Sequence, residues 1–90
     1  MSMSEKRIKL IEERLSQLNP SYIDIEDEGH LHVGHAGAKS GGHFKIKIIS
    51  DMFKDKSIIE RHRVIYKCLN DLMNTEIHAI SIKAKHKEED

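Results

Sequence analysis

The sequence predicts an α+β fold in which helices cover one face of a three-stranded mixed sheet. Apolar residues recur at three- and four-residue steps in two segments, which is typical of amphipathic helices. In three other segments they alternate with polar residues, which is typical of strands with one wet face. The segments follow the order helix, strand, strand, short helical turn, helix, strand. This order predicts an antiparallel pair and then a parallel strand returned by a helical crossover.

The first helix is expected from Ser4, and Asn19-Pro20 should end it, because the residue before a proline disfavours helical backbone. Its apolar residues share one face: Ile8, Ile11, Leu15 and Leu18. A β-like stretch follows over residues 22–26, where Tyr22, Ile23 and Ile25 interleave with acidic residues.

The clearest strand is expected over residues 43–50, where Phe44, Ile46 and Ile48 alternate with lysines. Residues 51–56 are interpreted as a turn or a single helical turn. A third alternating strand is expected over residues 77–84.

A long helix should start at Ser57, which forms a capping-box pattern with Glu60. Its expected apolar stripe and flanking residues are Ile58, His62, Ile65, Leu69 and Leu72, with Ile59, Tyr66 and Met73 beside them. The expected opposite side carries Glu60, Arg63, Lys67 and Asn74.

The 90 residues fit one domain over residues 1–90, with a core over about 4–84 and a charged tail over 85–90 that should fray. Fifteen basic residues balance fifteen acidic ones, so the chain as a whole has no charge footprint for nucleic acid or a membrane. Cys68 is the only cysteine, which excludes an internal disulfide. With no apolar leader or membrane span apparent, we expect a soluble cytoplasmic protein.

Four of the seven histidines and all five glycines fall between Gly29 and Asp51. These histidines are His30, His32, His35 and His43. Neutral imidazole is a common metal ligand, although a solvated loop without function is the alternative. An all-histidine structural zinc site is disfavoured, because such sites usually include cysteines. If the second and third strands pair in parallel, the loop end at Gly42 should lie beside His78.

Other candidates favour structural interpretations. His78 has the strand parity of Ile80 and Ile82, so an inward-facing histidine bonded to backbone is an equal alternative to a ligand. His62 and Cys68 fit a helix core. The basic residues of the long helix could bind phosphate, but a solvated face is favoured: Arg61, Arg63 and Lys67.

The glycine patterns do not predict a phosphate or nucleic-acid loop. The GxxG from Gly34 to Gly37 is expected to join two strands, whereas a nucleic-acid-binding KH loop joins two helices. Residues 37–42 are followed by His43-Phe44 and a strand, so they do not form a P-loop. No nucleophile, base and orienting acid occur at a recognisable spacing, so an enzyme is not expected.

Four ordered blocks, HVGHAGA, GGHFKIKIISDMF, ERHRVIYKCLNDLM and IHAISIKA, make the chain similar to the BolA family from about Ile8 to Ala84. The resemblance implies an α-β-β-α-α-β fold related to class II KH domains. The chain departs from the family pattern at Asp55, where BolA sequences commonly have glycine, and it lacks a tryptophan after the last strand.

The resemblance also implies that the protein binds a CGFS-type monothiol glutaredoxin and shares a glutathione-ligated 2Fe-2S cluster with it, in cluster assembly, trafficking or iron sensing. His78 matches one family ligand. His35 is the best match for the second, with His32 or His30 as alternatives. The expected partner-binding residues are His43, Phe44, Arg61, His62, Arg63 and Ala79. No cofactor is expected in the isolated protein, which should be a monomer or weak homodimer.

The alternative function is a DNA-binding transcriptional regulator that uses the KH-like fold. Its expected contacts are Arg61, Arg63 and Lys67, and DNA would then be a partner. The balanced net charge and the position of the GxxG sequence count against direct DNA recognition as the main activity.

Overall fold

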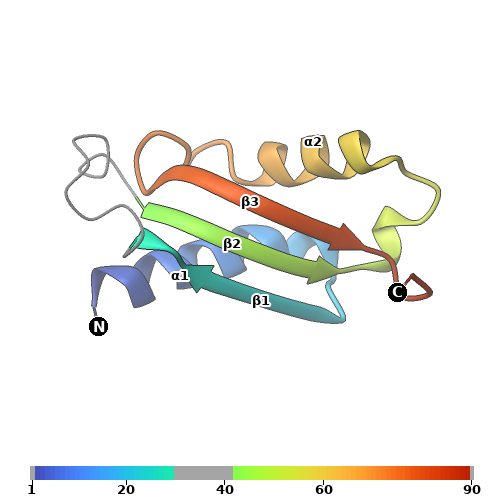
Figure 1. The fold of residues 1–90 in the computed structure, drawn as a ribbon, viewed down its shortest axis with the longest axis horizontal. Coiled ribbons are helices and arrows are strands. Elements are labelled where there is room, and N and C mark those ends of the chain that lie inside the picture. Colours follow the sequence, from blue (N-terminus) through green and yellow to red (C-terminus); the bar gives the residue numbers. More distant parts are fainter. Residues whose placement is uncertain (1, 30–41, 90) are drawn as a thin grey trace.

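The computed structural model describes residues 2–29 and 42–89. The elements, in order, are α1 (Met3–Leu15), η1 (Ser16–Leu18), β1 (Tyr22–Asp27), β2 (Gly42–Ile49), η4 (Asp51–Phe53), α2 (Ile58–Cys68) and β3 (Ile77–Lys85). Figure 1 shows them along the chain, with the short 3-10 helix η4 between β2 and α2. The predicted order of helices and strands is therefore confirmed.

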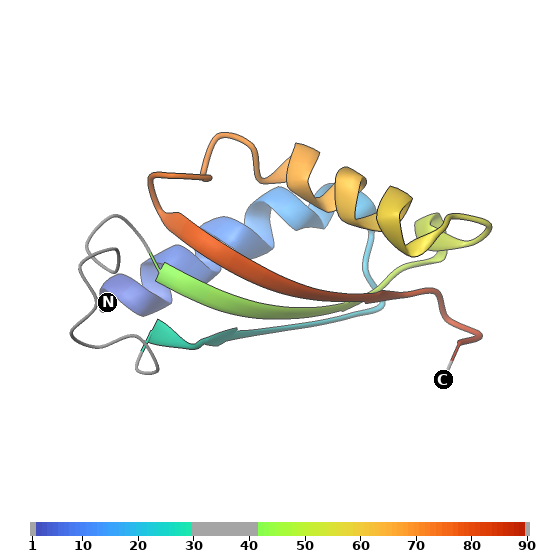
Figure 2. The ribbon, with the colours of Figure 1, turned by 45° about the horizontal axis from the view of Figure 1, so that its top comes forward.

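The three strands form one mixed sheet in the order β1-β2-β3. β1 pairs antiparallel with β2, and β3 pairs parallel with β2. Figure 2 shows α1 and α2 on the same side of this sheet, which leaves its other face open. The predicted topology and the one-sided helical cover are both confirmed.

The core lies between the helices and the covered face of the sheet. On β2, Phe44, Ile46 and Ile48 are buried, while the intervening Lys45 and Lys47 are exposed on the open face. The helices, η1, η4, the segment after α2 and β3 complete the core with Ile11, Leu15, Leu18, Phe53, Ile65, Leu69, Leu72 and Ile77. The period of two on β2 thus positions the core as the sequence predicted.

The start of α1 differs slightly from the prediction. Ser2, not Ser4, is the N-cap, and its hydroxyl accepts a hydrogen bond from the Glu5 backbone N–H. At the other end, the chain leaves η1 through Asn19, whose φ of 48° is left-handed. Asparagine tolerates this conformation better than most residues, so it stops the helix before Pro20.

The turn between η4 and α2 contains Asp55, which has a φ of 64°. This left-handed conformation favours glycine, the residue common at this position in BolA sequences, but aspartate also adopts it. The departure from the family pattern therefore leaves the turn intact. α2 then begins with the predicted capping box, in which Ser57 and Glu60 bond to each other's backbone N–H. These bonds lower the pKa of the Glu60 carboxyl.

The predicted apolar stripe of α2 is wrong in its first turn. Ile58 and Ile59 are 68% and 65% exposed, whereas Arg61 is only 7% exposed. Ile65, Leu69 and Leu72 are buried as predicted. α2 therefore turns the side that carries Arg61, Ile65 and Leu69 toward the core. Residue type alone did not predict this orientation, because arginine is rarely buried.

Arg61 is buried because its guanidinium bonds to three parts of the chain. Nε donates to the Lys56 carbonyl at 2.9 Å, and Nη1 donates to the Ala84 carbonyl at 3.1 Å. Nη1 also lies 2.6 Å from Oε1 of Glu89. Arg61 thus joins the start of α2 to the end of β3 and to the C-terminal segment. The charged C-terminal segment therefore contacts the rest of the fold through Glu89.

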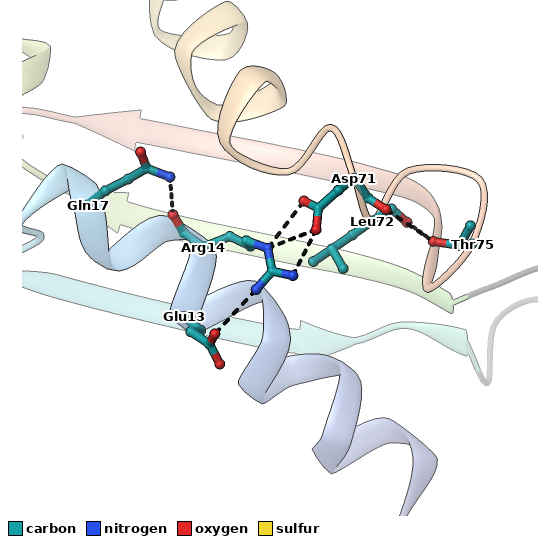
Figure 3. A network of polar contacts seen from close by, with 6 residues as sticks. All are labelled: Glu13, Arg14, Gln17, Asp71, Leu72 and Thr75. Carbon is teal, nitrogen blue, oxygen red and sulfur yellow. Dashed lines mark hydrogen bonds and ion pairs between the residues drawn. The ribbon is translucent and has the colours of Figure 1, made fainter.

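A second arginine joins α1 to the segment after α2, as shown in Figure 3. Nη2 of Arg14 lies 2.7 Å from Oδ2 of Asp71, and Nε donates to both carboxylate oxygens. This contact lowers the pKa of Asp71 and raises that of Arg14. Its energetic value is small because both side chains reach solvent, but its two-pronged geometry fixes how the two segments align.

We expect Arg61→Ala to lower the free energy of unfolding by about 2 kcal/mol, because it leaves two partly buried carbonyls without their donor. Arg63→Ala is the matched control, since Arg63 is exposed two residues further along the same helix. Urea unfolding followed by circular dichroism measures both. Equal losses in the two variants would contradict the structural role of Arg61.

Candidate functional site

The end of the glycine-rich segment lies beside the start of β3. Gly42 is opposite Ile77 in the parallel ladder, and the Gly42 N–H donates to the Glu76 carbonyl at 3.1 Å. Because both strands begin at this edge, residues about 35 positions apart in sequence become neighbours. The predicted proximity of Gly42 and His78 is confirmed.

Two histidines meet at this edge. The ring centroids of His43 and His78 are 5.0 Å apart, with the ring planes inclined by 40°. The strand register shifts between Gly42 and His43, so that His43 is opposite Ala79 and His78 is an extra residue on β3. Such a bulge turns a side chain away from the regular alternation.

The bulge corrects one expectation. His78 is exposed, although its sequence parity with Ile80 and Ile82 allowed an inward-facing histidine. The inward-facing placement is therefore wrong, and the imidazole reaches solvent.

The remaining predicted ligands, His30, His32 and His35, lie outside the described residues. Within residues 2–29 and 42–89, no three histidine, cysteine, aspartate or glutamate side chains are grouped so that they could hold a metal ion. His43 and His78 thus form a pair of nitrogen donors at the edge that the loop enters.

Cys68, the only thiol in the chain, does not add to this donor pair. It is half-buried on α2 and packs against the core. Burial raises the pKa of the thiol. A cysteine binds iron as the thiolate, and a raised pKa disfavours that form. Cys68 is therefore poorly suited to bind iron. Because the chain has no other cysteine, any thiolate for an iron–sulfur cluster would come from another molecule.

The open face of the sheet carries a local charge pattern that the net charge does not reveal. Lys45 and Lys47 of β2 project there with Lys83 of β3, which is opposite Lys47. The acidic residues of this face are on β1, where Asp24 and Glu26 lie opposite the β2 lysines. The balanced net charge concealed this basic strip, but strand parity could have revealed it.

The structure divides the predicted partner-binding residues into two groups. Phe44 is 1% exposed in the core and Arg61 is tied to backbone carbonyls, so neither side chain is available to a partner. This corrects both assignments, and it also removes Arg61 from the predicted DNA contacts. The other four residues are exposed or half-buried: His43, Ala79, His62 and Arg63. His43 and Ala79 lie opposite each other at the histidine edge, whereas His62 and Arg63 are on α2.

The sequence profile described as BolA-like protein matches residues 15–89. The chain belongs to the BolA family. BolA relatives include Protein BOLA1, chloroplastic, of Arabidopsis thaliana, which is 37% identical over 86 residues, covering 90% of this chain and 54% of the relative. The DNA-binding transcriptional regulator BolA of Haemophilus influenzae is 37% identical over 75 residues, covering 82% of this chain and 71% of that protein.

Solved BolA structures share the fold. The BolA domain of SufE1 from Arabidopsis thaliana superposes with a TM-score of 0.77 at 40% identity, covering 88% of this chain and 90% of that one. Some relatives are longer proteins. The chain spans about half of chloroplastic BOLA1 and about a quarter of SufE-like protein 1 from the same plant, at 54% and 24% of their lengths. Within residues 2–29 and 42–89, no helix has the length and apolar character needed to cross a membrane.

Gly42 allows the close approach of the backbone at the histidine edge. A Cβ at this position would lie 2.6 Å from Cε2 of Phe44, whose ring is buried and cannot move aside freely. We therefore expect Gly42→Ala to lower the free energy of unfolding by about 1–3 kcal/mol through overpacking. Thermal unfolding would measure the loss, and histidine ring signals in NMR spectra would report the disturbance at His43 and His78.

Gly29→Ala is the matched control. A Cβ there would meet the Asp27 side chain, with Oδ1 at 2.9 Å and Cγ at 3.8 Å. Rotation of that side chain would relieve the contact and give up the hydrogen bond that Oδ1 accepts from the Gly29 N–H. The expected cost is about 0.5 kcal/mol, because that bond is only partly buried. Comparable losses in the two variants would mean that the packing of Gly42 against Phe44 does not constrain the edge.

Proposed function

We propose that this BolA-family protein binds a CGFS-type monothiol glutaredoxin and shares a glutathione-ligated 2Fe-2S cluster with it. The role would be in cluster assembly, cluster trafficking or iron sensing. The family resemblance supplies the partner and the cofactor. The observation that carries the proposal is the pair of imidazoles at the edge where β2 and β3 begin.

The histidine ligands that this chain offers fit a cluster site shared with a partner better than a site formed by this chain alone. A 2Fe-2S cluster requires four ligands and supplies reversible one-electron chemistry when bound. His78, exposed by the bulge, would be one ligand, and His35 of the loop the other, with His32 or His30 as alternatives. The partner's cysteine and glutathione would provide the thiolates that the described residues lack near this edge.

His43 contributes in a different way in this proposal. Its ring lies within 5.0 Å of the His78 ring, and its strand position is set by the β2–β3 ladder. It limits the orientations open to His78, so that the coordinating nitrogen is held at the edge before a partner arrives. Holding a ligand in place in this way reduces the entropy lost on binding.

The second candidate is DNA-binding regulation, which the names of the Haemophilus influenzae and Escherichia coli relatives favour. Three residues were expected to contact DNA, and Arg61 is buried in an ion pair. The other two, Arg63 and Lys67, are on the surface. Two cations on α2 give a smaller electrostatic contribution than sequence-independent DNA binding usually requires. We therefore rank it below the cluster-sharing function.

The test is to reconstitute a CGFS glutaredoxin with iron, sulfide and glutathione, add this protein, and record visible absorption and circular dichroism. We expect the wild-type protein to change the cluster spectrum. His78→Ala should abolish the change, because it removes one of only two expected nitrogen ligands. His35→Ala should reduce it.

His86→Ala is the histidine control, because His86 follows β3 at its other end and contacts Glu89. It should leave the spectral change intact. Unchanged spectra with wild-type protein would refute cluster sharing. A change that survives both His35→Ala and His78→Ala would support the complex but reject these ligands. Binding of promoter DNA that persists near physiological salt and depends on sequence would favour regulation.

A further inference from the structure

The outward face of α2 carries large apolar side chains that the fold does not cover. Ile59 is 65% exposed and Tyr66 is 42% exposed on this face. They belong to a shallow hollow of about 610 Å³, lined by Ile59, His62, Arg63, Tyr66, Lys67 and Asn70. The first five of these positions are on α2 at three- and four-residue steps, and Asn70 lies in the turn that follows, so the hollow runs along one face of the helix.

The charged residues that line the hollow are both basic, and Glu60 lies at its border. Its lining has two permanent cations, Arg63 and Lys67, and no carboxylate. The nearest acidic residues in sequence are engaged elsewhere, Glu60 in the capping box and Asp71 with Arg14. In the parts of the chain that the structure describes, no carboxylate lies within ion-pair distance of Arg63 or Lys67. Glu60, one turn before Arg63, is near enough to interact with it electrostatically but forms no ion pair with either cation among the described residues. Apolar and cationic groups thus lie together on this face.

The spacing on this face suits another helix. Ile59 and Tyr66 are seven residues apart, which is about two turns and about 10.5 Å along the axis. An amphipathic helix offers apolar side chains at the same interval and can pack alongside, with its polar flanks reaching the rims. Carboxylates on those flanks would meet Arg63 and Lys67.

We propose that the outward face of α2 docks an acidic amphipathic helix of a partner protein. An apolar side chain of that helix occupies the hollow between Ile59 and Tyr66, and flanking carboxylates pair with Arg63 and Lys67. The hollow contains neither His43 nor His78, but it includes His62 and Arg63, two of the residues that the family resemblance assigns to glutaredoxin binding. Its docking of a helix requires no cluster. It gives the protein a second contact, by which a client or regulatory protein could bind.

Charge argues against the two other occupants. A second copy packed by two-fold symmetry would bring Arg63 and Lys67 of one molecule near the same residues of the other, which costs energy. Nucleic acid binding relies on neutralising many phosphates, yet this hollow combines only two cations with exposed apolar groups. An acidic helix satisfies both features of the surface.

The test is a selection from a displayed library of helical peptides about 20 residues long, long enough to form a helix once docked. The core positions of the library are apolar, and its flanking positions encode acidic, basic and neutral residues equally. We expect enrichment of acidic flanks on the wild-type protein. The charge-reversed Arg63→Glu/Lys67→Glu variant should instead enrich basic flanks.

The best wild-type peptide is then labelled and titrated by fluorescence anisotropy. Ile59→Ser and Tyr66→Ala should each weaken its binding by about tenfold or more, as expected when an anchor in a contact centre is removed. Lys6→Glu/Lys9→Glu is the control for charge reversal, because both lysines are exposed on α1. The double variant His43→Ala/His78→Ala should bind as wild type, which separates this surface from the cluster site.

Four outcomes would overturn the proposal. The first is peptide enrichment that ignores flank charge. The second is peptide binding that Ile59→Ser and Tyr66→Ala leave intact. The third is sedimentation showing a dimer that these variants abolish, which would identify a second copy as the occupant. The fourth is tighter binding of a single-stranded oligonucleotide of about 20 nucleotides than of the best peptide, near physiological salt and dependent on Arg63 and Lys67.

Discussion

The parallel pairing of β2 with β3 is the interaction on which the rest of the structure depends. It requires a crossover connection, which is why η4 and α2 lie between the two strands and why α2 covers the sheet. It also brings the starting ends of both strands to one edge. His43 and His78 meet there through the ladder and the bulge, rather than through any local sequence motif. The core and the candidate site are two results of the same pairing.

Arginine contacts hold the surrounding elements in register with that sheet. Arg61 joins the beginning of α2 to the end of β3, and Arg14 joins α1 to the segment after α2. Both bring together parts of the chain that are distant in sequence. Arg61 also shows how a charged residue can take an interior position when backbone carbonyls meet its guanidinium. Its burial rotates α2 and leaves Ile58, Ile59 and Tyr66 on the outside.

The histidine edge and the outward face of α2 divide the molecule into two functional surfaces. The edge has two nitrogen donors and no larger ligand group among the described residues, which fits a ligand set completed by a partner. The α2 face has apolar anchors and cations, which fits a protein segment. A small accessory protein with both surfaces could hold a cluster-bearing partner and a second protein at the same time.

The sequence by itself determined the order of the elements, the alternation that buries Phe44, Ile46 and Ile48, and the capping box at Ser57, because these depend on local periodicity and short-range hydrogen bonds. The strand order also predicted that Gly42 and His78 would meet. Only the tertiary structure decided the side of α2 that faces inward and the orientation of His78. Both depend on contacts across the fold, namely the carbonyls that bind Arg61 and a bulge in the β2–β3 register, and neither leaves a periodic signal in the sequence.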